Sequence, residues 1–281
     1  MNSSKAATAI EPGEVWLVGA GPGDPELLTR KAERMLLCAS VVFYDALVGA
    51  GVLALVPGHV RLVSVGKRSG RHSKDQQTID QLIVEAALAG ERVVRLKGGD
   101  PSIFGRATEE LDACRAAGVS VRICPGVTAA SAAAASLGTS LTLRGMARKL
   151  TFVTAHARAG EALDLDWAAL AGSGATLAIY MGKAAAQEIS SQLIRAGLPA
   201  DTPVALIENA SMSNERLFRT RLDLLPLAAA SALDDGPAIL LIGEAMRPRT
   251  NSLEALPVAI GNGLPAAQIG RHFAKHATRA D

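Results

Sequence analysis

The stretch VVRLKGGDPSIFGR, residues Val93 to Arg106, runs from an apolar segment directly into two glycines, an aspartate and a proline. A short apolar run bounded by glycine is typical of a buried strand. Glycine has no Cβ, so Gly98 and Gly99 allow a sharp reversal and let a ligand lie against the backbone. In open parallel sheets, ligands bind beyond the carboxyl ends of the strands. This stretch therefore predicts a parallel α/β protein with a binding loop after one of its strands.

Further strand-like runs surround this stretch and alternate with helical patterns. They are VWLVGA from Val15, VVFY from Val41, RLVSV from Arg61, RVVRL from Arg92 and VSVRIC from Val119. The clearest helical pattern follows Ser73, which forms a capping-box pair with Gln76, and Gly90 is placed to end it. This alternation predicts an α/β domain with a largely parallel sheet.

A change of composition marks the connection to a second domain. Residues 126–145 read GVTAASAAAASLGTSLTLRG, which predicts a small-residue helix followed by a loop. A second set of strands follows, with helices near 184–196 and 223–230, and predicts a mixed α/β domain. We expect an N-terminal domain over 14–135, a C-terminal domain over 146–248 and a loosely ordered tail over 249–281.

The bulk composition narrows the function classes. Among 281 residues the net charge is +2 and aromatic residues make up 3%, which disfavours a general nucleic-acid or membrane-surface binder. No segment approaches the apolar length of a membrane span and no signal peptide is indicated, so we expect a cytoplasmic protein. The three cysteines lack metal-ligand spacing and are interpreted as core residues, and no metal is expected.

Two glycine loops leave alternatives open on local grounds. In GAGPGDP, a dinucleotide-binding loop is one alternative, but Asp24 stands where that pattern requires its last glycine. The other alternative is a turn into a helix, with Asp24 as N-cap and Pro25 at the first helical position, and it leaves the three glycines unexplained. In GGDP, Asp100 offers an acceptor for an ammonium or hydroxyl group, or it caps a following helix.

Taken together, the motifs resemble those of the tetrapyrrole methylases, over about residues 14 to 245. The matching stretches are VGAGPGDPELLT, VVFYDALV, VGKR, RVVRLKGGDPSIFGR, CPGVTAASAAAASLGTSLT, YMGK and PVALIENAS. The resemblance implies two α/β domains with S-adenosylmethionine bound between them, normally in a homodimer. It also implies methylation of uroporphyrinogen III at C2 and C7, giving precorrin-2 for sirohaem or cobalamin, and release of S-adenosylhomocysteine.

The resemblance also implies which residues form the site. Asp45 is the expected proton acceptor and Lys67 the expected proton donor. The residues that would contact the cofactor are Pro22, Gly98, Gly99, Asp100, Ile103, Thr128, Ala129, Met181 and Ala210. On local grounds alone, Asp45 is equally consistent with a helix cap.

The expected substrate carries eight carboxylates, so its site should concentrate cations. Arg68, Arg71, His72 and Arg144 are the candidates, with further basic residues in RGMARK and RLFRTR that are equally consistent with solvated surface positions. Two positions depart from the family pattern: Leu143 replaces a common histidine, and Ala210 replaces a glycine.

Three rival hypotheses remain at this point. One is another enzyme of the same fold with a different acceptor, such as a later precorrin methylase or a diphthine synthase. The second is a nucleotide-binding oxidoreductase that uses GAGPG, with Asp45 on a ribose. The third is a binding protein that holds S-adenosylmethionine without turnover.

Overall fold

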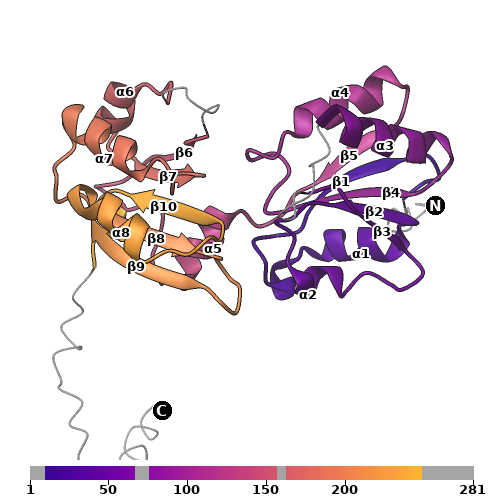
Figure 1. The fold of residues 1–281 in the computed structure, drawn as a ribbon, viewed down its shortest axis with the longest axis horizontal. Helices are drawn as coiled ribbons and strands as arrows, with labels where there is room; N and C mark the ends of the chain where they lie inside the picture. The colour runs from indigo at the N-terminus through magenta and orange to yellow at the C-terminus, as the bar shows by residue number, and fades with distance from the viewer. Residues whose placement is uncertain (1–9, 67–75, 157–162, 249–281) are drawn as a thin grey trace, which may run out of the picture. The chain divides into compact units, whose positions relative to one another are not determined.

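The structure is a computed structural model that describes residues 10–66, 76–156 and 163–248. The two described five-stranded sheets, one in each half of the chain, belong to a single structural unit that ends at Arg247 (Figure 1). The predicted fold class, two α/β halves with a parallel sheet followed by a mixed one, is confirmed.

The first sheet is parallel throughout and has the strand order β3-β2-β4-β1-β5. Its strands are β1 (Val15–Gly19), β2 (Val41–Tyr44), β3 (Arg61–Ser64), β4 (Val93–Lys97) and β5 (Val121–Cys124). β1 and β4 are buried on both faces, so their apolar residues do not alternate with exposed polar ones, and β4 also holds the buried Arg95 and Lys97. β4, the strand of the opening stretch, lies at the centre of the sheet.

Helices cover both faces of this sheet (Figure 1). α1 (Arg30–Cys38) and α2 (Ala50–Leu53) pack on one face, where Met35 and Val52 contact the core around Val18. α3 (Gln76–Leu88) and α4 (Ala107–Ala116) pack on the other, where Ile83 joins the core around Leu17. Gly90 takes the left-handed conformation just after α3, with φ of 82°, as the helix-ending prediction requires. Ser73, the predicted cap, lies outside the described residues.

The second sheet is mixed and has the order β6-β7-β10-β8-β9. β6 and β7 are parallel, and the remaining pairs are antiparallel. The strands are β6 (Leu150–Thr154), β7 (Thr176–Tyr180), β8 (Pro203–Glu208), β9 (Arg216–Arg221) and β10 (Ala238–Ile242). α6 (Trp167–Gly172), α7 (Ala186–Arg195) and α8 (Leu225–Ser231) supply one core with side chains of β7, β8 and β10.

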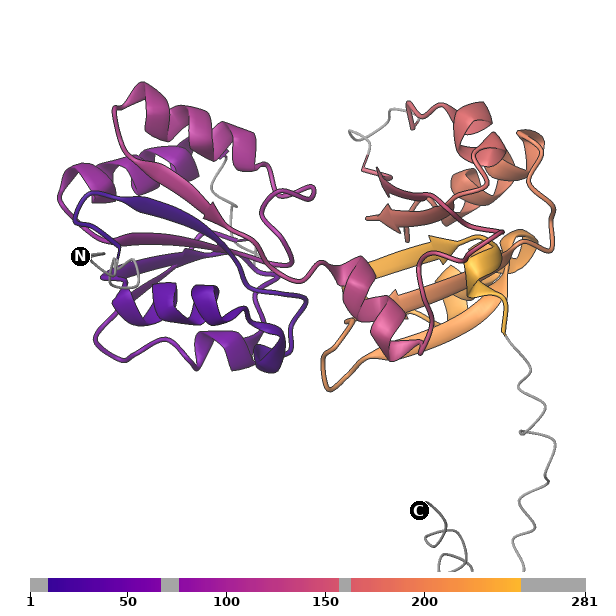
Figure 2. The same cartoon turned by 180° about the vertical axis from the view of Figure 1, so that it is seen from behind.

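The small-residue helix α5 (Ala129–Ser136) covers the other face of this second sheet (Figure 2). Its alanines pack against Ala178, Ala205 and Ile239, so small side chains on both sides allow a close approach. The predicted boundaries placed most of α5 in the N-terminal domain, whereas its packing partners belong to the C-terminal sheet. The boundaries 14–135 and 146–248 otherwise stay predictions, and the predicted tail 249–281 lies outside the described residues.

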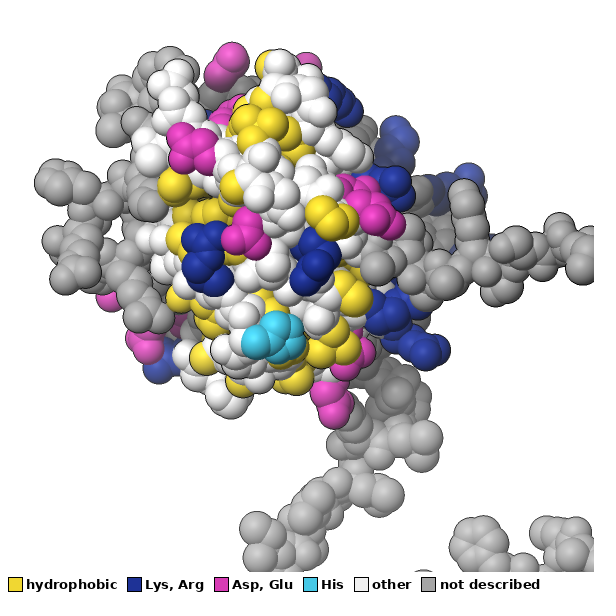
Figure 3. All heavy atoms as spheres, turned by 90° about the vertical axis from the view of Figure 1, so that its right-hand side faces the viewer, with side chains coloured by type: hydrophobic (Ala, Val, Ile, Leu, Met, Phe, Trp, Pro, Cys, Tyr) yellow, Lys and Arg dark blue, Asp and Glu magenta, His cyan; other side chains and the backbone are white. Residues whose placement is uncertain are grey.

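Charged side chains of both signs are interspersed on the face shown in Figure 3. This mixture agrees with the balanced net charge of the sequence, +2. Among the helices of the described residues, none is both long and apolar enough to cross a membrane.

Candidate active site

The carboxyl ends of the parallel strands open into a cavity of about 410 Å³. The first half of the chain lines it with the segments that follow β1, β2, β3, β4 and β5, and the second half lines it with residues at the ends of β7 and β8 and the start of β10. This volume is in the range of small-molecule sites. The cavity therefore lies where an open parallel sheet is expected to bind its ligand.

Four glycines at or just after the ends of β1, β4 and β5 interlock beside this cavity. The loop after β1 and the loop after β4 exchange two backbone hydrogen bonds, Gly99 N to Gly21 O at 2.7 Å and Gly21 N to Gly99 O at 3.2 Å. A Cβ at Gly19 would lie 2.6 Å from both Gly126 N and Gly99 O. Of the glycines that the turn alternative left unexplained, Gly19 is thus required by the close approach of neighbouring strand ends, whereas Gly21 and Gly23 have positive φ of 71° and 149°, which favour glycine.

The aspartates of the two glycine loops form local turns. Asp24 accepts a hydrogen bond from Glu26 N and caps the 3-10 helix η1 (Pro25–Leu27), as the turn alternative predicted. Asp100 accepts from Ser102 N at 2.7 Å and from Gly126 N at 3.0 Å, but no helix begins there, because α4 starts only at Ala107. A carboxylate has about four acceptor positions, so Asp100 keeps capacity for a ligand.

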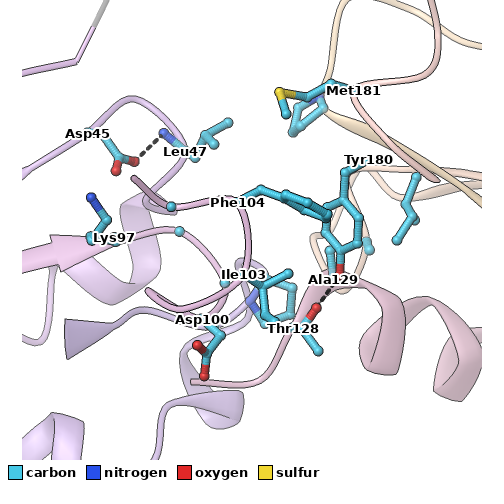
Figure 4. Close-up of a pocket in the computed structure, with 18 of the residues that line it drawn as sticks. Asp45, Leu47, Lys97, Asp100, Ile103, Phe104, Thr128, Ala129, Tyr180 and Met181 are labelled. Carbon is cyan, nitrogen blue, oxygen red and sulfur yellow. Dashed lines mark hydrogen bonds between the residues drawn. The ribbon is translucent and has the colours of Figure 1, made fainter. Parts of the chain in front are cut away.

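Asp45 follows β2 and faces the cavity with Lys97 beside it (Figure 4). Its Oδ1 accepts from Leu47 N at 3.0 Å, and its Oδ2 lies 3.4 Å from the Arg95 guanidinium. The N-cap of the following helix α2 is Gly49, so the helix-cap alternative for Asp45 is wrong. Asp45 is therefore a partly exposed carboxylate fixed at the cavity wall.

Tyr180 and Met181, at the end of β7, form the opposite side of the cavity (Figure 4). The Tyr180 hydroxyl pairs with Thr128 Oγ1 at the N-cap of α5 and accepts from Ala130 N at 3.3 Å. Its ring lies 5.1 Å from that of Phe104, centroid to centroid. Burial raises the pKa of Tyr180, so the phenol stays protonated and can donate to Thr128.

Replacing Tyr180 with phenylalanine should lower the free energy of unfolding by about 1–3 kcal/mol, because the Thr128 hydroxyl and the Ala130 amide lose a shared partner. Urea denaturation would measure the loss. Tyr44→Phe is the matched control, because the Tyr44 hydroxyl makes no hydrogen bond with the part of the chain that the structure describes. An equal loss in both variants would contradict the assignment.

Non-glycine residues with a left-handed backbone gather at this cavity. Phe104, Arg106 and Met181 have φ of 52°, 55° and 56° and line it, while Asn209 and Ser211 flank Ala210, which also lines it. Such conformations cost free energy and persist only where the surroundings impose them. Their concentration here is typical of a functional site.

The structure brings most of the predicted site together. Every residue that the sequence assigned to the cofactor lines the cavity: Pro22, Gly98, Gly99, Asp100, Ile103, Thr128, Ala129, Met181 and Ala210. Asp45 lines it as well. Lys67, Arg68, Arg71 and His72 lie outside the described residues, so their roles stay predictions.

The predicted arginine candidates elsewhere do not reach the cavity. Arg144 is exposed and is not among its lining residues. On β9, Arg216 pairs with Asp234, Arg219 donates to the carbonyl oxygens of Met246 and Leu137, and Arg221 pairs with Asp223. The arginines of RLFRTR therefore lie on the edge strand β9, mostly exposed, in agreement with the alternative of solvated surface positions.

Sequence reasoning missed two cations that do line the cavity, Arg95 and Lys97. They occupy alternate positions of the buried strand β4, and the buried Glu110 of α4 pairs with both. The available signal was the pair of basic residues inside an otherwise apolar strand, since buried cations require a partner.

Fold and site together define an α/β protein with a small-molecule cavity at the carboxyl ends of its parallel strands. The model of the tetrapyrrole (corrin/porphyrin) methylases matches residues 14–226. A uroporphyrinogen-III C-methyltransferase of Paracoccus denitrificans is 48% identical over 231 residues, which cover 82% of this chain and 80% of that protein. The chain belongs to the tetrapyrrole methylase family, and the resemblance inferred from its motifs is confirmed.

Two further similar proteins differ in length from the first. A siroheme synthase of Gluconacetobacter diazotrophicus is 45% identical over 243 residues, which cover 86% of this chain and 52% of that protein, so the chain spans about half of its length. A uroporphyrin-III C-methyltransferase from Thermus thermophilus, crystallised with S-adenyl homocysteine, is 40% identical with a TM-score of 0.70 and covers 83% of this chain and 98% of that one.

Proposed function

We propose that this chain transfers methyl groups from S-adenosylmethionine to C2 and C7 of uroporphyrinogen III, giving precorrin-2 by way of precorrin-1. The observation that carries the proposal is the cavity itself, because motif residues from both halves of the chain, separated by up to 188 positions between Pro22 and Ala210, line one site. The named relatives of similar length support the same acceptor.

The lining residues fit S-adenosylmethionine. Apolar side chains of Ile103, Met181 and Ile207 suit its adenine ring and methylene groups, and Asp100 keeps acceptor capacity for its ammonium or hydroxyl groups. When bound, the cofactor supplies a methyl group on a positively charged sulfur. Phe104 and Tyr180 present aromatic surface in the same cavity and help to exclude water.

Asp45 is proposed as the group that receives the proton. Attack by a pyrrole carbon on the methyl group leaves a cationic ring that must lose a proton, and a carboxylate at the cavity wall is a suitable acceptor. The hydrogen bond from Leu47 N and the nearby Arg95 hold the Asp45 carboxylate in one orientation. Lys67 stays a predicted proton donor, and Arg68, Arg71, His72 and Arg144 stay predicted carboxylate contacts.

Anaerobic incubation of the purified protein with S-adenosylmethionine and uroporphyrinogen III tests the proposal, with S-adenosylhomocysteine release and product mass as readouts. We expect the addition of two methyl groups. Binding without transfer to this acceptor would instead favour a different tetrapyrrole acceptor or a binding protein, and a preference for NAD would favour the oxidoreductase alternative.

The assembly and location stay predictions. The family resemblance supports a homodimer in the cytoplasm, with the product feeding sirohaem or cobalamin. Light scattering of the purified chain at micromolar concentration would test the dimer, and a single-chain mass would contradict it.

A further inference from the structure

Glu110 is a fully buried carboxylate that lies directly behind the cavity wall. Its side chain, on α4, has 0% exposure and accepts from Lys97 Nζ at 2.7 and 2.9 Å and from Arg95 Nε at 2.9 Å. Arg95 and Lys97 are two residues apart on β4, so both side chains leave the same face of the strand toward α4. One carboxylate therefore holds two cations that line the cavity.

Arg95 connects this carboxylate to Asp45. Beyond its bond to Glu110, the guanidinium donates to Leu96 O at 2.9 Å and lies 3.4 Å from Asp45 Oδ2. Because its donors face three different partners, the planar group is fixed in one orientation. The other carboxylate oxygen of Asp45 accepts a hydrogen bond from Leu47 N, so both oxygens of Asp45 are held.

Stability alone gives little reason to bury these charges. The rest of this sheet face packs apolar side chains, including Leu17, Phe43 and Val93. Replacing a buried ion cluster by apolar groups is often neutral or stabilising, because desolvation of the charges is costly. Burial, the largest cause, and the Arg95 charge lower the pKa of Lys97, and Glu110 opposes this. A costly cluster beside a cavity points to a role in that cavity.

Lys97 also supports the loop that follows β4. A Cβ at Gly105 would lie 3.2 Å from Lys97 Cε and 2.5 Å from Pro101 O, so the loop rests directly on the lysine stem. This loop carries Ile103 and Phe104 into the cavity. By holding Lys97, Glu110 therefore also supports the loop.

We propose that Glu110 is a positioning residue, which fixes Arg95 and Lys97 and, through Arg95, holds Asp45 in the orientation that receives the proton from the methylated ring. The inference rests on the proposed function. In the transfer, the pyrrole carbon forms a bond to the methyl group while the methyl–sulfur bond breaks and releases S-adenosylhomocysteine. A C–H bond of an adjacent methylene bridge then breaks, its electron pair neutralises the cationic ring, and the proton becomes bound to Asp45. Glu110 then remains as the carboxylate that balances Arg95 and Lys97.

Glu110→Gln is the first test. We expect kcat to fall about ten- to a hundred-fold, while the Kd of S-adenosylmethionine measured by calorimetry changes less than about two-fold. Asp112→Asn, on the same helix, is the matched control, because Asp112 is exposed and pairs with the exposed Arg115. An unchanged kcat in Glu110→Gln, with an active wild type, would overturn the inference.

A second variant separates positioning from stability. Lys97→Met with Glu110→Leu removes one cation and one carboxylate, so it leaves the net charge unchanged and should recover much of the melting temperature that Glu110→Gln loses. We expect its kcat to stay low, because Arg95 still lacks the partner at Nε. A kcat that recovers together with the melting temperature would show that the cluster only stabilises the fold and would overturn the inference.

A double-mutant cycle tests the route through Asp45. In an Asp45→Asn background, Glu110→Gln should cause little further loss of kcat, because both changes affect the same proton acceptor. Losses that multiply would contradict this route. A wild-type protein that binds S-adenosylmethionine but does not methylate uroporphyrinogen III would instead overturn the proposed function, and the inference with it.

Discussion

Replacing Gly126 with alanine is expected to lower the free energy of unfolding by about 3 kcal/mol or more and to abolish cofactor binding. A Cβ at this position would lie 2.3 Å from Gly99 O and 2.9 Å from Gly19 Cα. These are backbone atoms of neighbouring strand ends, so no side-chain rotation can relieve the contact. Three loops that line or underlie the cavity would have to separate.

Urea denaturation and calorimetric titration with S-adenosylmethionine would measure the two effects. Gly172→Ala is the matched control, because nothing lies within 4 Å of its added Cβ and the residue ends helix α6. Alanine is a better helix former than glycine, so this control should match or slightly exceed the wild-type stability. A Gly126→Ala protein that unfolds at the wild-type urea concentration would refute the interlock.

Asp45→Asn should reduce kcat by about 10²- to 10⁴-fold, the usual contribution of a general base. Asparagine has nearly the same shape and can still accept from Leu47 N, so the change removes mainly the charge and the basicity. The Kd of S-adenosylmethionine should change little. Single-turnover measurement of S-adenosylhomocysteine release would follow the loss.

Asp24→Asn is the matched control for this variant. Asp24 also follows a parallel strand and also accepts from the amide two residues on, but it is not among the residues that line the cavity. Its turnover should stay near that of the wild type. A comparable kcat in Asp45→Asn and the wild type would remove Asp45 from the proton transfer and leave the cofactor site unaffected.

The sequence predicted the strands and the cofactor loops well because both depend on local residue patterns. The buried strands β1 and β4 are largely apolar, with glycine at the end of β1 and directly after β4, and each predicted cofactor residue follows a strand. In a parallel sheet the carboxyl ends of the strands meet at one edge, so identifying them largely identifies the site.

The role of the basic residues could not be predicted in the same way. Arg95 and Lys97 lie inside a strand whose other residues are apolar and pair there with the buried Glu110, whereas Arg219 of β9 donates to the backbone carbonyl oxygens of Met246 and Leu137. Whether a cation binds a substrate or a neighbouring carboxylate depends on what the fold places beside it, because a partner distant in sequence decides its burial and pairing.

By itself, the sequence determined the order of strands and helices, the glycine loops and the family, since each of these is encoded in short segments. Only the tertiary structure decided that Gly19 and Gly126 are required by each other and by the carbonyl oxygen of Gly99, that α5 packs on the second sheet, and that Glu110 lies behind Asp45. These relations join residues from different strands and helices, and close packing in three dimensions, rather than local preference, sets them.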